Sequence, residues 1–222
     1  MDVIEAIRTR KSMRGFRPDP VPKEVLRDIL DIARRAPSSM NTQPWEITVV
    51  SGQALDNIKR DNIQMLASRA IPDPDISRQP FEGVFRQRQV DLAVELFQLM
   101  GIAREDKERR AEWMQRGFRF FDAPAAIILS VDRSLHESWP RFDIGTISQT
   151  ICLAALNYGL GTCIEDQGVM YPEIVRKYTG IPASKRIIVS IAIGYPDWDF
   201  PANKVESERE PVESITTWCG FD

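Results

Sequence analysis

The spacing of apolar residues predicts a chain made mostly of helices. In residues 22–36, Leu26, Ile29 and Ala33 fall on one helical face, and Pro22 suits the first turn. Helical spacing or helix-end residues mark further stretches at residues 2–7, 55–70, 85–103, 106–121, 144–158 and 172–180. Gly159 is well placed to end the helix over 144–158.

Four short apolar runs predict buried β-strands. They cover residues 45–50, 125–131, 160–164 and 187–193. Because helices outnumber these short strands, the pattern predicts an α+β fold in which helices cover both faces of a small sheet. No repeat or linker interrupts the pattern, so residues 1–222 are expected to form a single domain.

The last stretch of the chain, residues 195–222, is polar and contains three prolines. This composition predicts an extended tail with little core of its own. We expect such a tail to pack on another surface, and a partner subunit is the natural candidate. A disordered tail is the alternative.

Charge and histidine content exclude several classes of function. The chain has 29 Lys and Arg against 32 Asp and Glu, and its net charge of -3 argues against a nucleic-acid-binding surface. Its one histidine, His136, excludes a metal site built from two histidines of one chain. A Ser-His-Asp triad would have to use His136, but the polar sequence around it indicates a surface loop.

The cysteines and the N-terminal sequence indicate a cytoplasmic protein. Cys152, Cys163 and Cys219 lack the C-x-x-C spacing of zinc and dithiol centres, so no metal is expected. An odd, sparse set of cysteines is typical of a reducing cytosol. The first residues contain no signal-peptide core, and no apolar run approaches the ~18 residues of a membrane span.

A basic stretch, Arg8-Thr9-Arg10-Lys11-Ser12-Met13-Arg14, follows the first predicted helix, and its last five residues, Arg10 to Arg14, are named the basic segment. Guanidinium groups and a hydroxyl are suited to binding a phosphate group. The alternative is that these cations stabilise the C-terminal end of the helix dipole.

Small polar residues dominate the segment from Pro37 to Trp45, between a predicted helix and a predicted strand. Ser38, Ser39 and Asn41 offer donors and acceptors suited to a flat heterocycle. Ordinary turn and capping chemistry is the alternative.

A glycine-containing segment runs from Gly159 to Gly168. It does not fit a dinucleotide-binding fingerprint, because the order is helix, glycine and strand, without the third glycine. The better interpretation is a strand whose end, near Cys163 to Glu165, presents backbone N–H groups to a ligand.

Taken together, these segments resemble the nitroreductase family of FMN-dependent oxidoreductases. The resemblance rests on an ordered set of motifs: Arg10-Lys11-Ser12-Met13-Arg14, Pro37 through Trp45, Phe121-Asp122-Ala123-Pro124, Asp143-Ile144-Gly145, Gly159 through Cys163, and Arg209-Glu210-Pro211-Val212. It implies a three-layer α/β/α fold with a small mixed or antiparallel sheet. It also implies an intertwined homodimer that exchanges C-terminal tails.

The resemblance also implies which residues bind FMN. Arg10, Ser12 and Arg209 would hold the phosphate, and Arg14 would lie near N1 and O2 of the ring. Ser207 departs from the family pattern, in which a Lys or Arg is common. The full set of expected cofactor-binding residues is Arg10, Lys11, Ser12, Arg14, Pro37, Ser38, Ser39, Asn41, Gln43, Cys163, Ile164, Glu165, Ser207 and Arg209.

The expected activity is ping-pong hydride transfer through flavin N5, from NADPH or NADH to a nitroaromatic or quinone-like acceptor. Such chemistry needs no protein nucleophile, which agrees with the single histidine; backbone near Glu165 would support N5. Ser38, Ser39 and Asn41 would contact the flavin of the partner subunit.

Residues 71–114 match the family least and are expected to form a variable lid over the flavin. Phe81, Phe85, Arg86 and Arg88 are candidate contacts for an aromatic anion; the alternative is a helix with a core stripe and a solvated face. Two alternative functions stay open. One is a specialised branch of the family, either a reductive dehalogenase or a flavin-degrading enzyme, and the other is a non-enzymatic flavin-binding protein. The lid contains no tyrosine, which argues against the dehalogenase branch.

Overall fold

The computed structural model describes residues 2–77, 79–136 and 138–221, and its centre is a four-stranded antiparallel sheet. The strands lie in the order β1-β2-β4-β3. Their bounds are Glu46–Ser51 for β1, Ala125–Asp132 for β2, Gly161–Glu165 for β3 and Lys185–Gly194 for β4. Every pairing among these four strands is antiparallel, whereas the family resemblance implied either a mixed or an antiparallel sheet.

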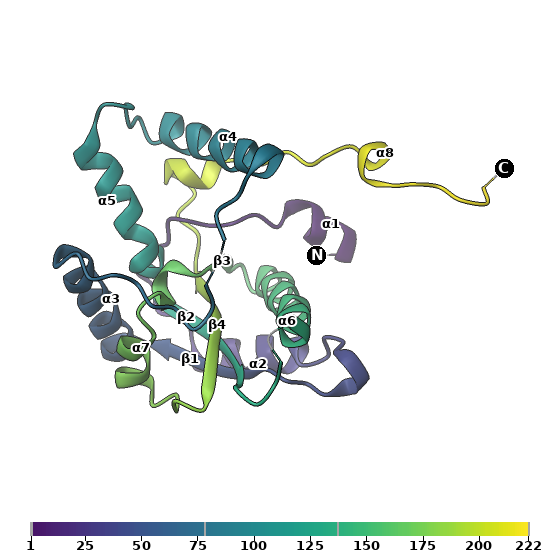
Figure 1. Ribbon diagram of the computed structural model, residues 1–222, viewed down its shortest axis with the longest axis horizontal. Coiled ribbons are helices and arrows are strands. Elements are labelled where there is room, and N and C mark those ends of the chain that lie inside the picture. The colour runs from purple at the N-terminus through teal and green to yellow at the C-terminus, as the bar shows by residue number, and fades with distance from the viewer. Residues whose placement is uncertain (1, 78, 137, 222) are drawn as a thin grey trace.

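Helices cover both faces of this sheet, so the predicted α+β class and three-layer arrangement are confirmed (Figure 1). Helices α2 and α6 pack on one face, and α3 and α7 pack on the other. The helix bounds are Val3–Thr9 (α1), Lys23–Ala33 (α2), Gly52–Ala67 (α3), Gly83–Leu99 (α4), Lys107–Phe118 (α5), Ser138–Leu156 (α6), Pro172–Thr179 (α7) and Val212–Ile215 (α8).

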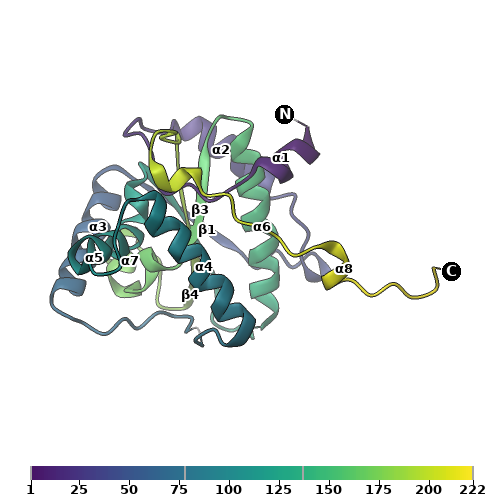
Figure 2. The same cartoon turned by 90° about the horizontal axis from the view of Figure 1, so that it is seen from above.

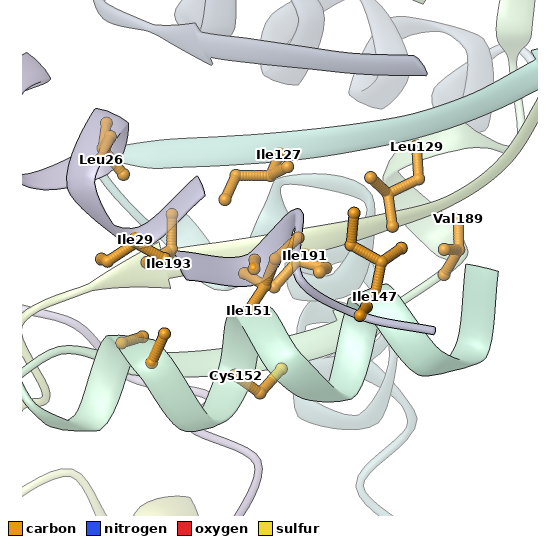
Figure 3. Packing of buried hydrophobic residues seen from close by; sticks show 14 of the residues in the cluster. Leu26, Ile29, Ile127, Leu129, Ile147, Ile151, Cys152, Val189, Ile191 and Ile193 are labelled. Atoms are coloured by element: carbon orange, nitrogen blue, oxygen red, sulfur yellow. The ribbon is translucent and has the colours of Figure 1, made fainter. Parts of the chain in front are cut away.

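The two central strands, β2 and β4, are buried along nearly their whole length. Alternate side chains of a strand point to opposite faces, so Ile127 and Ile191 pack toward α6, whereas Ile128 and Ala192 pack toward α3 and α7. Figure 3 shows the first of these layers, where Ile147 of α6 lies against the strands. Burying each such large aliphatic side chain contributes roughly 1.5–3 kcal/mol before conformational entropy is subtracted.

Helices α4 and α5 form an outer layer that the chain after β4 helps to hold (Figure 2). Leu96 of α4 packs with Ala202 and Val205, and all three are buried. The prediction of a coreless tail over residues 195–222 is therefore wrong for its first part, in which a 3₁₀ turn at Pro201–Lys204 is anchored in the body. Residues 206–211 still run along α4, where Glu210 pairs with Arg88, and only from α8 onward does the chain extend away from the body in both views.

Several predicted helix ends are displaced, and each displacement has a local cause. The helix expected over 55–70 begins at Gly52, whose φ of +55° lets the chain leave β1 and start α3 at once. The helix expected over 106–121 ends at Phe118, because Phe120, Phe121 and Asp122 adopt left-handed φ values of 54°, 53° and 61°. Similarly, α4 ends at Leu99 and does not reach the expected residue 103.

The long helix α6 starts before its expected first residue, Ile144. It already includes Ser138, and Pro140 is tolerated near its beginning because first-turn N–H groups need no helical partner. Trp139 and Phe142 are 68% and 70% exposed, so they do not continue the buried stripe by which the helix was identified. The expected α7 is confirmed: Pro172 is its first residue, and Gly180 ends it with a φ of +75°.

No helix within the described residues is long and apolar enough to cross a membrane. Within the same part of the chain, no cluster of three or more His, Cys, Asp or Glu side chains could hold a metal ion.

Candidate functional site

The basic segment after α1 is held between the edge of the sheet and the chain after β4. The Met13 N–H donates to the Thr162 carbonyl of β3 at 2.9 Å, and Ser12 forms a parallel bridge with Thr162. On the other side, the Arg17 N–H donates to the Tyr195 carbonyl at 2.9 Å. The segment therefore extends the sheet beyond its edge strand β3 and fixes Arg14 beside the end of that strand.

A cavity of about 260 Å³ lies where Arg14 meets β3. Arg14, Cys163, Ile164 and Glu165, all expected in the cofactor site, line it together. Ile164 is 42% exposed between buried neighbours, so the end of β3 turns one apolar side chain and its backbone toward open space. The structure thus brings together two motifs that lie about 150 residues apart in the sequence, as a ligand site between distant segments requires.

The outer layer supplies the opposite wall of this cavity. Leu96 comes from α4, Trp113 and Met114 come from α5, and Phe121 comes from the tight turn after α5. Trp113 and Met114 lie in the helix expected over residues 106–121 and were not expected to line the site. Their place at the end of the lid expected over residues 71–114 was a usable signal, and Phe121 belongs to the motif Phe121-Asp122-Ala123-Pro124.

The cations of the basic segment lack anionic partners. No carboxylate pairs with Arg10, Lys11 or Arg14 within the parts of the chain that the structure describes. The Arg14 side chain makes one long contact, from Nη1 to the Ser12 carbonyl at 3.5 Å. Three uncompensated cations in five residues form a donor set suited to an anionic ligand such as a phosphate.

The structure does not bring Ser207 and Arg209 to this cavity. The Arg209 guanidinium donates to the Ser207 carbonyl, the Ser207 hydroxyl and the Glu208 carbonyl at 2.8–2.9 Å. Both residues line a separate hollow of about 840 Å³, where Arg88 of α4 forms a 2.7 Å ion pair with Glu210. In this chain, Arg209 is therefore occupied by its own backbone.

Burial keeps the two ionisable side chains at the end of β3 neutral. It raises the pKa of the Cys163 thiol to about 12, although Arg14 nearby acts in the opposite direction. Burial also raises the pKa of Glu165 to about 8, against hydrogen bonds from the Ser190 hydroxyl and the Gly168 N–H that favour the anion. Near neutral pH the strand end therefore carries little negative charge toward the cavity.

The segment expected to contact the partner's flavin is anchored on α6. The Ser39 N–H donates to the buried Asp143 carboxylate at 3.1 Å, and the Thr146 hydroxyl donates to the Pro37 carbonyl at 2.8 Å. The role of Asp143 was not anticipated, although a buried acid on an apolar helix was a usable signal. Figure 1 shows this segment beside α6.

The geometry of this segment leaves most of its side chains open to solvent. Ser38 accepts from the Gln43 N–H at 3.0 Å, which closes the loop. Met40, Asn41 and Gln43 adopt left-handed φ values of 52°, 58° and 48°, which are strained for residues other than glycine. Met40 is 93% exposed, and none of Pro37, Ser38, Ser39, Asn41 and Gln43 lines the cavity beside Arg14 in the same chain.

The candidate acceptor contacts do not form one pocket. Phe81 and Phe85 are 51% and 62% exposed, and Arg88 lies over the Phe85 ring at 5.8 Å. Arg86 lines a different hollow of about 760 Å³ on α4, away from the residues that surround Arg14. Within one chain, the helix with a solvated face describes Phe85, Arg86 and Arg88 better, and Phe81 precedes α4.

Comparison with known proteins gives a consistent result. The family model described as "Nitroreductase family" matches residues 7–195. The chain is 34% identical to a nitrobenzene nitroreductase of Ectopseudomonas oleovorans, over 97% of this chain and 96% of that protein. It is 32% identical to a chloronitrobenzene nitroreductase of Comamonas testosteroni, with the same coverage.

Solved structures agree with the sequence comparison. The crystal structure of the FMN- and NADPH-dependent nitroreductase NfnB from Sphigopyxis sp. strain HMH superposes with a TM-score of 0.94, at 29% identity and full coverage of both chains. The FMN-dependent nitroreductase NfnB from Mycobacterium smegmatis, solved in complex with NADPH, gives a TM-score of 0.91 at 29% identity and 97% coverage of both chains.

The raised pKa of Glu165 predicts a pH-dependent stability. The folded pKa of about 8 lies above the ordinary value of 4.5, so between these values the folded protein binds more protons than the unfolded chain and loses stability as pH rises. Glu165→Gln cannot ionise. The free energy of unfolding of the wild type, relative to this variant, should fall by at most about 1.4 kcal/mol per pH unit from about pH 5 to 8. Urea unfolding across this range measures the difference, and a pH-independent difference would show that Glu165 is ionised throughout.

Proposed function

This chain belongs to the nitroreductase family, and we propose that it is an FMN-dependent oxidoreductase that carries electrons from NADPH or NADH to nitroaromatic or quinone-like acceptors. The observation that carries this proposal is the cavity at which the unpaired cation Arg14 meets the end of β3. The relatives named above supply the reaction class, because they are nitroreductases, and two structural neighbours use FMN with NADPH.

The donor set fits an anionic flavin nucleotide. Arg10, Lys11 and Ser12 would hold the phosphate and the adjoining chain, because this part of the basic segment offers a hydroxyl and cations without carboxylate partners in the described residues. Arg14 would lie beside the pyrimidine edge of the ring, and the backbone from Cys163 to Glu165 would contact its centre. Arg209 could join the phosphate only after releasing its contacts with Ser207 and Glu208.

When bound, FMN would supply the redox chemistry, which is hydride acceptance from the nicotinamide and electron transfer to the acceptor in a separate half-reaction. Arg14 would stabilise the negative charge of the reduced ring at the adjacent edge. Cys163 stays a thiol, because its pKa is about 12, and so it does not act as a nucleophile. The protein's contribution is therefore position, charge and exclusion of water.

The acceptor would bind between the flavin and the outer layer. Trp113 and Phe121 provide aromatic apolar surface, with ring planes tilted by 48° and centres 6.5 Å apart, which suits contact with an aromatic or quinone ring. The cavity of about 260 Å³ in one chain is smaller than the roughly 300–1,000 Å³ of typical ligand sites. We infer that a second chain completes the site.

We assign that role to a second copy of this chain, in a homodimer. Large apolar side chains remain exposed on α1, at the start of α6 and along the tail: Val3, Ile4, Ile7, Trp139, Phe142, Ile215, Trp218 and Phe221. Exposed apolar surface of this extent is typical of a subunit interface. The open loop over residues 37–43 would then reach the partner's cofactor. The three unpaired cysteines suit a cytoplasmic location.

The activity is tested by anaerobic reduction of the FMN-loaded protein. Addition of NADPH or NADH should bleach the flavin band near about 450 nm, and a nitroaromatic or quinone added afterwards should restore it, because the two half-reactions are separable. Absorbance spectra record both steps. A flavin band that resists both donors would contradict the reductase function, and recovery only when nucleotide and acceptor are present together would contradict the ping-pong order.

Loss of Arg10 should weaken FMN binding. Arg10→Ala removes a charge-assisted contact with the phosphate, worth roughly 1.5–3 kcal/mol, or about ten- to a hundredfold in the dissociation constant. Arg8→Ala is the matched control, because Arg8 lies on the exposed side of α1, outside the basic segment assigned to the phosphate. Flavin fluorescence titration of the apoprotein measures both constants. Equal FMN binding by the two variants would contradict the assignment of the phosphate to Arg10.

Disruption of the exposed apolar surface should separate the subunits. Phe142→Asp places a charge on α6 at the proposed interface and should shift the protein toward monomer. Trp198→Asp is the control, since Trp198 is 64% exposed on the turn after β4, outside that surface. Light scattering after size-exclusion chromatography gives the mass of each variant. A wild-type monomer, or dimers in both variants, would contradict the assignment.

A further inference from the structure

One buried amide holds the backbone on both sides of the Arg14–Gly15 peptide. The Asn203 Oδ1 accepts from the Arg14 N–H at 2.6 Å and from the Gly15 N–H at 3.2 Å. Its Nδ2 donates to the Gly15 carbonyl at 2.8 Å and to the Asp197 carbonyl at 2.7 Å. Asn203 is 2% exposed, and these four bonds use its full ordinary capacity.

The Arg14 carbonyl is held from the opposite direction by Arg116 of α5. The Arg116 Nη2 donates to this carbonyl at 3.0 Å and to the Phe121 carbonyl at 3.3 Å, and its Nη1 pairs with Asp122 at 2.9 Å. Both polar groups of the Arg14 backbone are therefore bound by side chains from other segments. One segment is the anchored part of the tail, and the other is the outer layer.

Close packing fixes these groups relative to one another. The Phe200 ring packs against both Arg116 and Gly15. The Arg116 guanidinium is 4.6 Å from the centre of this ring, and the ring atoms approach Gly15 closely. A Cβ added to Gly15 would lie 2.3 Å from the Phe200 Cγ, so only glycine fits at this position. Arg14 is thus attached to a block that cannot slide without breaking several contacts.

We propose that Asn203, together with Arg116, is a positioning residue that sets the place of the Arg14 charge in the cofactor site. The Arg14 side chain has one long contact of its own, at 3.5 Å, so the contacts that hold this residue are chiefly those of its backbone, and they fix the point from which the side chain reaches the site. An electrostatic interaction weakens as the separation between charges increases, and Arg14 displaced from the ring edge would stabilise reduced flavin less. This inference rests on the proposed FMN-dependent function.

The test compares Asn203→Ala with the wild type in two FMN-based measurements. The variant should bind FMN roughly tenfold more weakly, since one charge-assisted contact is misplaced. Its flavin reduction potential should shift to a more negative value. Asn62→Ala is the matched control: Asn62 is also fully buried and donates to the Phe118 and Gly168 carbonyls, but it does not contact Arg14. It should lower stability and leave the potential unchanged.

A double-mutant cycle separates positioning from a general loss of structure. In an Arg14→Ala background, Asn203→Ala should cause no further shift in potential, because the charge it positions is gone. Arg116→Lys keeps the charge but loses the bond geometry to the Arg14 carbonyl. It should shift the potential in the same direction, and it carries the test if Asn203→Ala does not fold.

Two results would overturn the inference while leaving the proposed function intact. The first is an unchanged flavin reduction potential in folded, FMN-loaded Asn203→Ala and Arg116→Lys. The second is a shift in potential caused by Asn203→Ala that persists fully in the Arg14→Ala background. Failure of the wild type to bind FMN would instead overturn the proposed function, and the inference with it.

Discussion

Burial of both faces of β2 and β4 is the constraint on which the rest of this structure depends. Two strands with apolar side chains on each face must be covered twice, and α2, α6, α3 and α7 provide that cover. The sheet is then complete except at its edges. The outer edge of β3 has no neighbouring strand, and Ser12 and Met13 of the basic segment bind along it. The location of Arg14 therefore follows from how this edge of the sheet is covered.

The same burial divides the charge of the site between its two sides. On the strand side, desolvation favours the neutral forms of Cys163 and Glu165. On the other side, Arg10, Lys11 and Arg14 are more exposed and have no carboxylate partners in the described residues. This asymmetry suits a ligand that has an anionic group at one end and a ring that gains negative charge when it is reduced.

Elements with continuous patterns could be predicted from the sequence, and isolated contacts could not. The runs of β2 and β4 were located to within two residues at each end, because burial on both faces leaves a continuous apolar signal. The start of α6 was missed, since exposed Trp139 and Phe142 do not repeat with the buried stripe. Residues 202–205 pack on α4 without any periodicity that marks them as core.

The candidate site shows the same division. Local motifs indicated the basic segment and the end of β3, but only the family resemblance implied that they meet. The contacts of Asn203 with Arg14 join positions 189 residues apart, and such pairs leave no local pattern in a single sequence.

That separation has a consequence for synthesis of the protein. A ribosome makes the chain from its N-terminal side, so the segment around Arg14 emerges 189 residues before its amide partner Asn203. Until residues 195–203 are available, the backbone at Arg14 and Gly15 lacks its contacts with Asn203. The cofactor site therefore becomes complete only after residue 203 has been made, and a nascent chain would have to acquire its flavin after that point.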